Sequence, residues 1–227
     1  MALPALPAAA QPAQAPAGDD GMTVLHLSES ADRAIRRDRL RVQLRVEVTA
    51  GTPKEVQAEI NRRMTSALGK VKAVPGIKPE SGGYSVYEER QQNVPSRWRG
   101  SQTLTLLDRD FAELLTLVGT LQNDGLAVSS LVFELSPEAA RAVQDELTSE
   151  AVKRLGERSE RVAADLHLSV LRYRDVRVGN VGGDRPVPLR AMTMAAAAPP
   201  VAEAGDAAVQ VTVDADIVLG ADDSKAP

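Results

Sequence analysis

The stretch that decides the fold runs from Arg39 to Thr49 and reads Arg-Leu-Arg-Val-Gln-Leu-Arg-Val-Glu-Val-Thr. Every second position is apolar, and polar or charged residues fill the positions between. Because side chains alternate across a β-strand, one face of this strand is wholly apolar. The pattern predicts a half-buried strand whose apolar face needs a cover. The apolar positions are Leu40, Val42, Leu44, Val46 and Val48.

Three amphipathic helices are expected to supply that cover. The first begins at Thr52-Pro53-Lys54-Glu55, which combines a threonine cap, a proline at the first helical position and the glutamate of a capping box. It should end near Lys72. The second is expected from Asp108 to Asn123, and the third from Ser136 to Leu166. The third helix, about 45 Å long at 1.5 Å per residue, is expected to overhang and meet a neighbouring subunit.

Further strands are expected on both sides of these helices. The stretch Met22 to Leu27 is a candidate to form a hairpin with the Arg39 strand across the polar stretch Ser28 to Asp38. The predicted fold class is α+β, a mainly antiparallel sheet with one face covered by three amphipathic helices, the third of them long. The remaining predicted strands cover residues 84–89, 98–107, 128–135, 170–178 and 209–219.

The domain organisation follows from composition. Residues 1–21 are rich in Ala, Pro and Gln and predict a disordered leader, or the remnant of a secretory signal peptide, because they carry an A-x-A pattern. Residues 22–219 form one predicted domain, with a long Pro- and Ala-rich loop over 180–206. Residues 220–227 form a predicted disordered tail.

Composition also limits the function classes. A net charge of −4, a pI near 5.4 and 3% aromatic residues argue against a nucleic-acid-binding protein. The chain has no cysteine, which excludes disulfides, thiol catalysis and Cys-ligated metals. No apolar run reaches 18 residues, so no transmembrane helix is expected.

The order of elements resembles the SIMPL domain family, a domain of unknown function. The matching stretches are Asp38 to Val42, which opens the first long strand, the helix from Glu55 to Val71, and Leu131 to Ser136 followed by Glu138-Ala139. The helix from Ala151 to Leu166 matches as well, and the resemblance covers about 22–219. One departure is Leu166-His167-Leu168, where the family usually has Leu-Gly, and another is Ser28-Glu29-Ser30 in place of Gly-x-Gly.

The resemblance implies an exported α+β protein, located in the periplasm or associated with the outer membrane. Members of the family include periplasmic oxidative-stress-defence proteins and an immunogenic envelope protein, and some assemble into rings or channel-like oligomers. The resemblance therefore implies a homo-oligomer with envelope contacts and a loose link to oxidative stress. It implies no catalytic residue.

The residues themselves offer little catalytic chemistry. His26 and His167 are far apart and belong to no metal-ligand motif, so surface or strand roles are expected. Gly179 to Gly183 follows a strand, but Pro186 and Pro188 stand where a dinucleotide-binding loop would lead into a helix. No catalytic, cofactor-binding or metal-binding residue is predicted.

Three candidate interaction sites remain. Trp98 lies between Arg97 and Arg99, and such clusters occur at interfaces, although a core position at a strand start is the other interpretation. Met192 and Met194 lie in an apolar loop that is suited to subunit docking, although a disordered excursion is the other interpretation. A basic cluster is a candidate contact for anionic lipid or polysaccharide, or else a solvated strand face balanced by acids: Arg36, Arg37, Arg39 and Arg41.

Three hypotheses follow for the function. The first is a non-enzymatic, exported protein that acts by self-assembly and envelope contacts. The second is a binding module for anionic envelope polymers or lipids that uses the basic cluster. The third is an enzyme of unknown reaction, which would need a pocket with converging polar groups.

Overall fold

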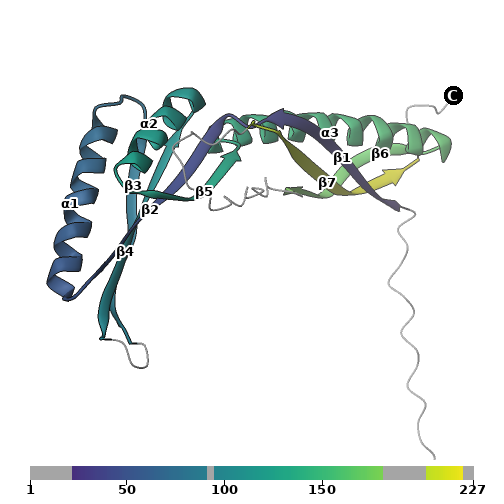
Figure 1. Ribbon diagram of the computed structural model, residues 1–227. Coiled ribbons are helices and arrows are strands. Elements are labelled where there is room, and N and C mark those ends of the chain that lie inside the picture. The colour runs from purple at the N-terminus through teal and green to yellow at the C-terminus, as the bar shows by residue number, and fades with distance from the viewer. Residues whose placement is uncertain (1–21, 91–94, 181–202, 222–227) are drawn as a thin grey trace, which may run out of the picture. The chain divides into compact units, whose positions relative to one another are not determined.

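The computed structural model describes residues 22–90, 95–180 and 203–221 of the 227-residue chain. The described part holds three helices and seven strands in two antiparallel sheets, which confirms the α+β class (Figure 1). The elements are β1 Thr23–Arg36, β2 Arg39–Ala50, α1 Pro53–Lys72, β3 Lys78–Glu89, β4 Arg97–Asp108, α2 Phe111–Asn123, β5 Ala127–Glu134, α3 Pro137–Asp165, β6 Ser169–Asn180 and β7 Asp206–Gly220.

The quoted stretch forms β2, which lies inside a four-stranded sheet of order β3-β4-β2-β5. It pairs antiparallel with β4, with Leu44 opposite Leu104, and antiparallel with β5 on its other side. The predicted alternation is confirmed, because Leu40, Val42, Leu44 and Val46 are fully buried while Arg45 is exposed. β2 therefore supplies the centre of the core.

Helix α1 covers the apolar face of this sheet. The capping box is present as predicted: the Glu55 amide donates to Thr52 Oγ1 at 3.3 Å, and the Thr52 amide donates to Glu55 Oε2 at 3.1 Å. The helix buries Val56, Ile60, Met64, Ala67 and Val71, which recur every three or four residues. These residues pack in one cluster with the buried side chains of β2 and β4.

Helix α2 packs in the same core, and Figure 1 shows α1 and α2 on one side of the four-stranded sheet. α2 begins three residues later than the predicted Asp108. The reason is that the Asp108 carboxylate accepts the Arg109 and Asp110 amides at 2.5 and 3.0 Å, so this turn is closed by a side chain. Asp110 then caps the helix by accepting the Glu113 amide at 3.0 Å.

The second sheet has three strands in the order β1-β7-β6. Its central strand β7 buries Val209, Val211, Val213, Ala215 and Ile217, which confirms the alternation expected near the end of the chain. β1 continues to Arg36, through residues that were predicted to form a polar link. The predicted hairpin between this strand and β2 is wrong, because β1 pairs with β7 and belongs to the other sheet. An edge strand can carry polar residues on its solvated side. The polar stretch after Leu27 therefore belongs to the strand and does not end it.

Helix α3 begins after the Ser136 cap and has 29 residues, close to the predicted bounds. Its buried residues recur every fourth position: Val143, Leu147, Ala151, Leu155, Ser159 and Ala163. Because the buried side chains form one narrow row, Val152 and Leu166 lie outside it and are exposed. Leu166 was predicted to face inward, so that prediction is wrong. None of the described helices is both long enough and apolar enough to span a membrane.

The chain divides into two compact units. Within the described residues, one comprises 22–29, 152–178 and 213–221, and the other comprises 30–151 together with the described parts of 179–212. We refer to them as the three-strand unit and the core unit. The predicted leader (1–21), most of the predicted loop (181–202) and most of the predicted tail (222–227) lie outside the described residues.

Candidate functional site

The Arg97-Trp98-Arg99 stretch begins β4 in the core unit. Trp98 is half-buried and packs against the hydrophobic core, as in the second of its two interpretations. Arg99 Nη2 lies 2.5 Å from Glu47 Oε1 and Arg99 Nη1 lies 3.6 Å from Glu89 Oε1. The hydrogen bond to Glu47 is the main cause that raises the pKa of Arg99 above its ordinary value. These contacts hold Trp98 and Arg99 within the core unit, and an interface role for them stays a prediction. Met192 and Met194 lie outside the described residues.

The basic cluster is engaged in ion pairs within the core unit. Arg39 Nε lies 2.6 Å from Glu134 Oε1, and Arg41 donates to both oxygens of the same carboxylate at 3.1 and 3.2 Å. Glu134 is 15% exposed, so these contacts are partly shielded from water. Arg37 donates its backbone amide to Gly205 O at 3.3 Å, and Arg36 is exposed on β1. The single Glu134 carboxylate thus offsets one of the two charges of Arg39 and Arg41, and Arg36 and Arg37 add two more positive charges to the predicted anionic contact site.

Next to this cluster, buried Ser136 joins β2 to α3. The Ser136 amide and hydroxyl donate to the Asp38 carboxylate at 2.6 and 2.7 Å, and Arg109 Nη2 donates to Ser136 Oγ at 2.9 Å. Partial burial would raise the pKa of Asp38, but the hydrogen bonds from Ser136 and the charge of Arg109 outweigh it, so the pKa is lowered. No histidine contacts Ser136 in the described structure. The geometry is that of a helix cap.

A hollow of about 450 Å³ adjoins this junction. Three basic and three acidic side chains line it: Arg39, Lys78, Arg109, Glu80, Asp108 and Glu138. Arg109 already pairs with Asp38 at 3.5 Å and with Glu138 at 3.4 Å. The formal charges balance, and the hollow favours neither an anionic nor a cationic ligand.

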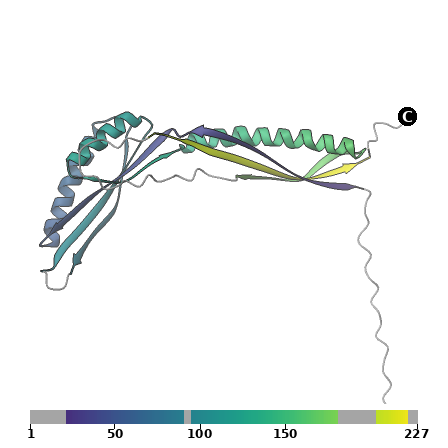
Figure 2. The ribbon, with the colours of Figure 1, turned by 45° about the vertical axis from the view of Figure 1, so that its right-hand side comes forward.

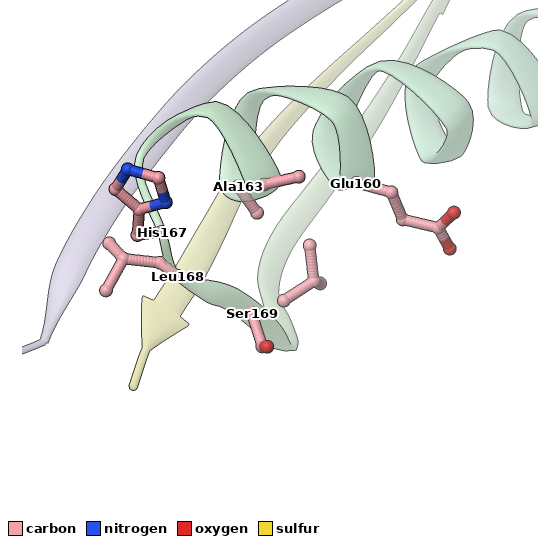
Figure 3. Close-up of a pocket in the computed structure, with 7 residues that line it drawn as sticks. Glu160, Ala163, His167, Leu168 and Ser169 are labelled. Carbon is pink, nitrogen blue, oxygen red and sulfur yellow. The ribbon is translucent and has the colours of Figure 1, made fainter. Parts of the chain in front are cut away.

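A second hollow, of about 550 Å³, lies at the C-terminal end of α3 in the three-strand unit. His167 lies in the turn that follows α3, and its backbone φ of 60° is in the left-handed region. In the same turn the Leu168 amide donates to Ala163 O at 2.8 Å. Figure 3 shows that the His167 ring, the Glu160 carboxylate and the Ser169 hydroxyl do not converge on one point. The residues that line the hollow are Glu160, Ala163, Ala164, His167, Leu168, Ser169 and Val170.

The described residues offer no cluster of side chains suited to a metal ion. No group of three or more His, Asp or Glu side chains among them is arranged to hold a metal ion. His26 contacts Asp216 at 2.6 Å on the exposed side of the three-strand unit, and His167 belongs to the turn described above. Both histidines have the surface and strand positions expected from the sequence.

Exposed apolar side chains are the more unusual feature, and they concentrate in the three-strand unit. Of ten large apolar residues that are exposed in the described structure, eight belong to this smaller unit; the other two are Tyr84 and Tyr87 of β3. Four of the eight lie on β6, where Val178 is 52% exposed. The eight, which we call the apolar surface, are Met22, Val24, Val152, Leu166, Leu171, Tyr173, Val176 and Val178.

No sequence pattern discussed above predicted this surface, although the pattern of β6 is unusual for a half-buried strand. A half-buried strand alternates strictly, but β6 has Leu171 and Tyr173 at odd positions and Val176 and Val178 at even positions. Apolar residues on both faces are typical of a strand covered on both sides. Tyr173 reaches α3, where its hydroxyl lies 3.1 Å from the Ser159 hydroxyl.

The fold defines an α+β protein with two antiparallel sheets in its described part. The family model SIMPL, described as "Protein of unknown function (DUF541)", matches residues 25–217. The chain therefore belongs to the SIMPL family. No curated protein matches the chain.

Proposed function

We propose that this SIMPL protein acts without catalysis, by self-assembly in the cell envelope after export. The observation that carries the proposal is the apolar surface, which gathers eight exposed large apolar side chains on the three-strand unit. These side chains lie on both faces of β6 as well as on other elements, and large exposed apolar areas on a protein commonly mark where it binds another molecule. Assembly would bury these side chains, and burial of apolar surface contributes about 25 cal/mol of favourable free energy per Å².

Export and an envelope location are the parts of the proposal that rest on the sequence. The A-x-A pattern near the N-terminus and the resemblance to periplasmic members of the family support them. A loose link to oxidative-stress defence comes from the same resemblance. Cell fractionation of a strain that expresses the full chain would test the location, and protein found only in the cytoplasm would contradict it.

The two other hypotheses receive less support. Binding of anionic lipids or glycans needs unpaired positive charge, whereas Arg39 and Arg41 share the Glu134 carboxylate. An enzyme needs convergent reactive groups, and the two hollows described above do not present them. Both hypotheses remain predictions that binding and activity assays can test.

Size-exclusion chromatography with light scattering tests assembly directly. At micromolar concentration the wild-type chain should elute as an oligomer. The double substitution Val176→Ser and Val178→Ser should lower the mass toward that of one chain, because it removes exposed apolar contact area from β6. A strictly monomeric wild-type chain would contradict the proposal of self-assembly.

The matched control lies on the other sheet. Tyr84 is 47% exposed on the edge strand β3, similar to the 48% of Val176, but it belongs to the core unit. Tyr84→Ser should leave the mass unchanged. If Tyr84→Ser lowers the mass and the valine substitutions do not, the assembly surface has been assigned to the wrong unit.

A further inference from the structure

The edge strands of the two sheets differ in the features that prevent pairing with a strand of another molecule. In the four-stranded sheet, edge strand β3 contains Pro79 and a register shift between Gly82 and Ser85, and edge strand β5 has only eight residues with an irregular register against β2. Proline, irregular register and short length are common means of preventing edge-to-edge pairing. These two edges are protected.

The edge strands of the three-stranded sheet lack two of these protections, proline and short length. β1 and β6 flank β7 and have 14 and 12 residues, and Figure 2 shows both as long arrows beside it. Neither strand contains proline, and the only glycine in either is Gly179, next to the end of β6. Both edges carry exposed apolar residues, among them Val24 on β1 and Val176 on β6. A long, apolar edge exposes backbone donors and acceptors that can pair with another strand.

Charge indicates which two edges fit together. β6 carries Arg172, Arg174 and Arg177 against one acid, Asp175, and the pair formed by Arg177 and Asp175 leaves two arginines without an ion pair in the described structure. Pairing of β6 with a second β6 would bring these arginines close to their own copies, which is unfavourable. By contrast, β1 has no Lys or Arg between Thr23 and Glu29. Of the two arginines further along β1, Arg33 pairs with Glu146 and Glu150 of α3, and Arg36 lies at the end of the strand, so the first half of β1 is the part that fits a basic strand.

The strand beside β1 adds negative charge. Asp214 and Asp216 lie on β7, the neighbour of β1, and Asp216 contacts His26 of β1 at 2.6 Å. If a basic strand paired with the free edge of β1, only β1 would separate its positive charges from these acids on β7. Pairing of β1 with a second β1 would gain no such attraction and would leave the exposed apolar residues of β6 uncovered.

We propose that β6 of one copy pairs edge to edge with β1 of the next copy, so that the protein assembles head to tail. This inference rests on the proposed function, because it specifies how the self-assembly occurs. The contact joins two different surfaces, so it is heterologous, and each copy keeps one free edge for a further copy. Repetition of such a contact produces a closed ring or an open filament, whereas a two-fold contact would stop at a dimer.

Site-specific cross-linking can test this arrangement because the chain has no cysteine. Two variants are needed: Val24→Cys on β1 and Val176→Cys on β6, both at exposed positions. Each variant alone and an equimolar mixture, mixed before assembly, are treated with a short bismaleimide that tolerates uncertainty in strand register. The mixture should give cross-linked dimers at several times the yield of either variant alone, and a chain with both substitutions should give a ladder of higher oligomers.

Two controls complete the experiment. Tyr84→Cys on β3, mixed with either variant, should give only background cross-linking. Light scattering on each variant shows whether it still assembles, which separates the two proposals. An oligomer in which Val176→Cys or Val24→Cys alone cross-links as strongly as the mixture, or in which no mixture cross-links, overturns the head-to-tail pairing but leaves self-assembly standing. A monomeric wild-type chain overturns both.

Discussion

Ser136 donates its backbone amide to Asp38 Oδ1 at 2.6 Å and its hydroxyl to Asp38 Oδ2 at 2.7 Å. The bonds connect the residue that precedes β2 with the residue that precedes α3, 98 positions later in the chain. Ser136 is 1% exposed, so its donors have little access to water as an alternative partner. This contact fixes the start of the long helix against the central strand of the four-stranded sheet.

Replacement of Asp38 by Asn should destabilise the protein by about 1–3 kcal/mol at pH 7, because a charged acceptor of two hydrogen bonds is lost. The pKa of Asp38 is lowered in the folded state, so its contribution is present above the pKa of the unfolded chain and is lost as the pH falls through the folded value. The difference between wild type and variant should therefore shrink below about pH 4. Urea unfolding at several pH values measures this.

Glu160→Gln is the control for that experiment, because Glu160 is exposed and has no ion pair among the described residues. It should change the free energy of unfolding little at any pH. If the Asp38→Asn difference stays constant from pH 7 to pH 3, the carboxylate contributes nothing that depends on its charge.

Replacement of Thr52 by Ala should cost about 1 kcal/mol, because it removes the oxygen that accepts the Glu55 amide at the start of α1. Thr52→Ser keeps a hydroxyl at the cap and should retain most of the stability. Thermal unfolding followed by circular dichroism compares the two variants. Equal losses in both would show that the hydroxyl is not what matters.

Replacement of Gly100 by Ala should destabilise the core. An added Cβ would lie 2.5 Å from Val56 Cγ1, 2.8 Å from Ile60 Cδ1 and 3.0 Å from Ser85 O. Overpacking of this kind costs about 1–3 kcal/mol. Gly69→Ala is the matched control, because a Cβ there meets nothing within 4 Å and alanine is favoured over glycine in the last turn of α1, where Gly69 lies. Gly69→Ala should stabilise by about 0.5–1 kcal/mol, and chemical denaturation should separate the two variants in opposite directions.

Replacement of His167 by Gly should stabilise the end of α3. His167 has φ 60, and a side chain in the left-handed region costs about 1–2 kcal/mol. The greater freedom of glycine in the unfolded chain offsets part of that gain. His167→Ala keeps a Cβ in the same conformation and should bring no comparable gain. If alanine stabilises as much as glycine, relief of backbone strain is not the cause. Urea unfolding of the two variants decides the matter.

Local sequence patterns predicted much of the fold. The alternation around Leu44 predicted β2, and the capping box at Thr52 predicted the first residue of α1, because each depends on neighbours along the chain. The extent of β1 was missed, because its edge position lets residues such as Asp32 and Arg36 stay exposed within a strand. The division of the strands between two sheets depends on which strands pair, and strand periodicity does not specify a partner.

The candidate sites show the same limit. Trp98 was flagged for its residue type, yet the fold packs it against the core. The basic cluster was flagged for its charge, yet Glu134, more than 90 positions away from Arg39 and Arg41, comes into contact with both. The apolar surface depends on which of many apolar side chains remain uncovered, and burial is a property of the folded chain.

The order of residues by itself determined the elements: an alternating strand at Arg39, a capped helix after Thr52 and a long helix after Ser136, because hydrophobic period and capping chemistry act over a few positions. Tertiary structure alone decided that β1 and β2 lie in different sheets and that β6 is an edge strand with exposed valines. The physical reason is that strand pairing and the exclusion of water join residues far apart in the chain, and short-range patterns carry no record of those partners.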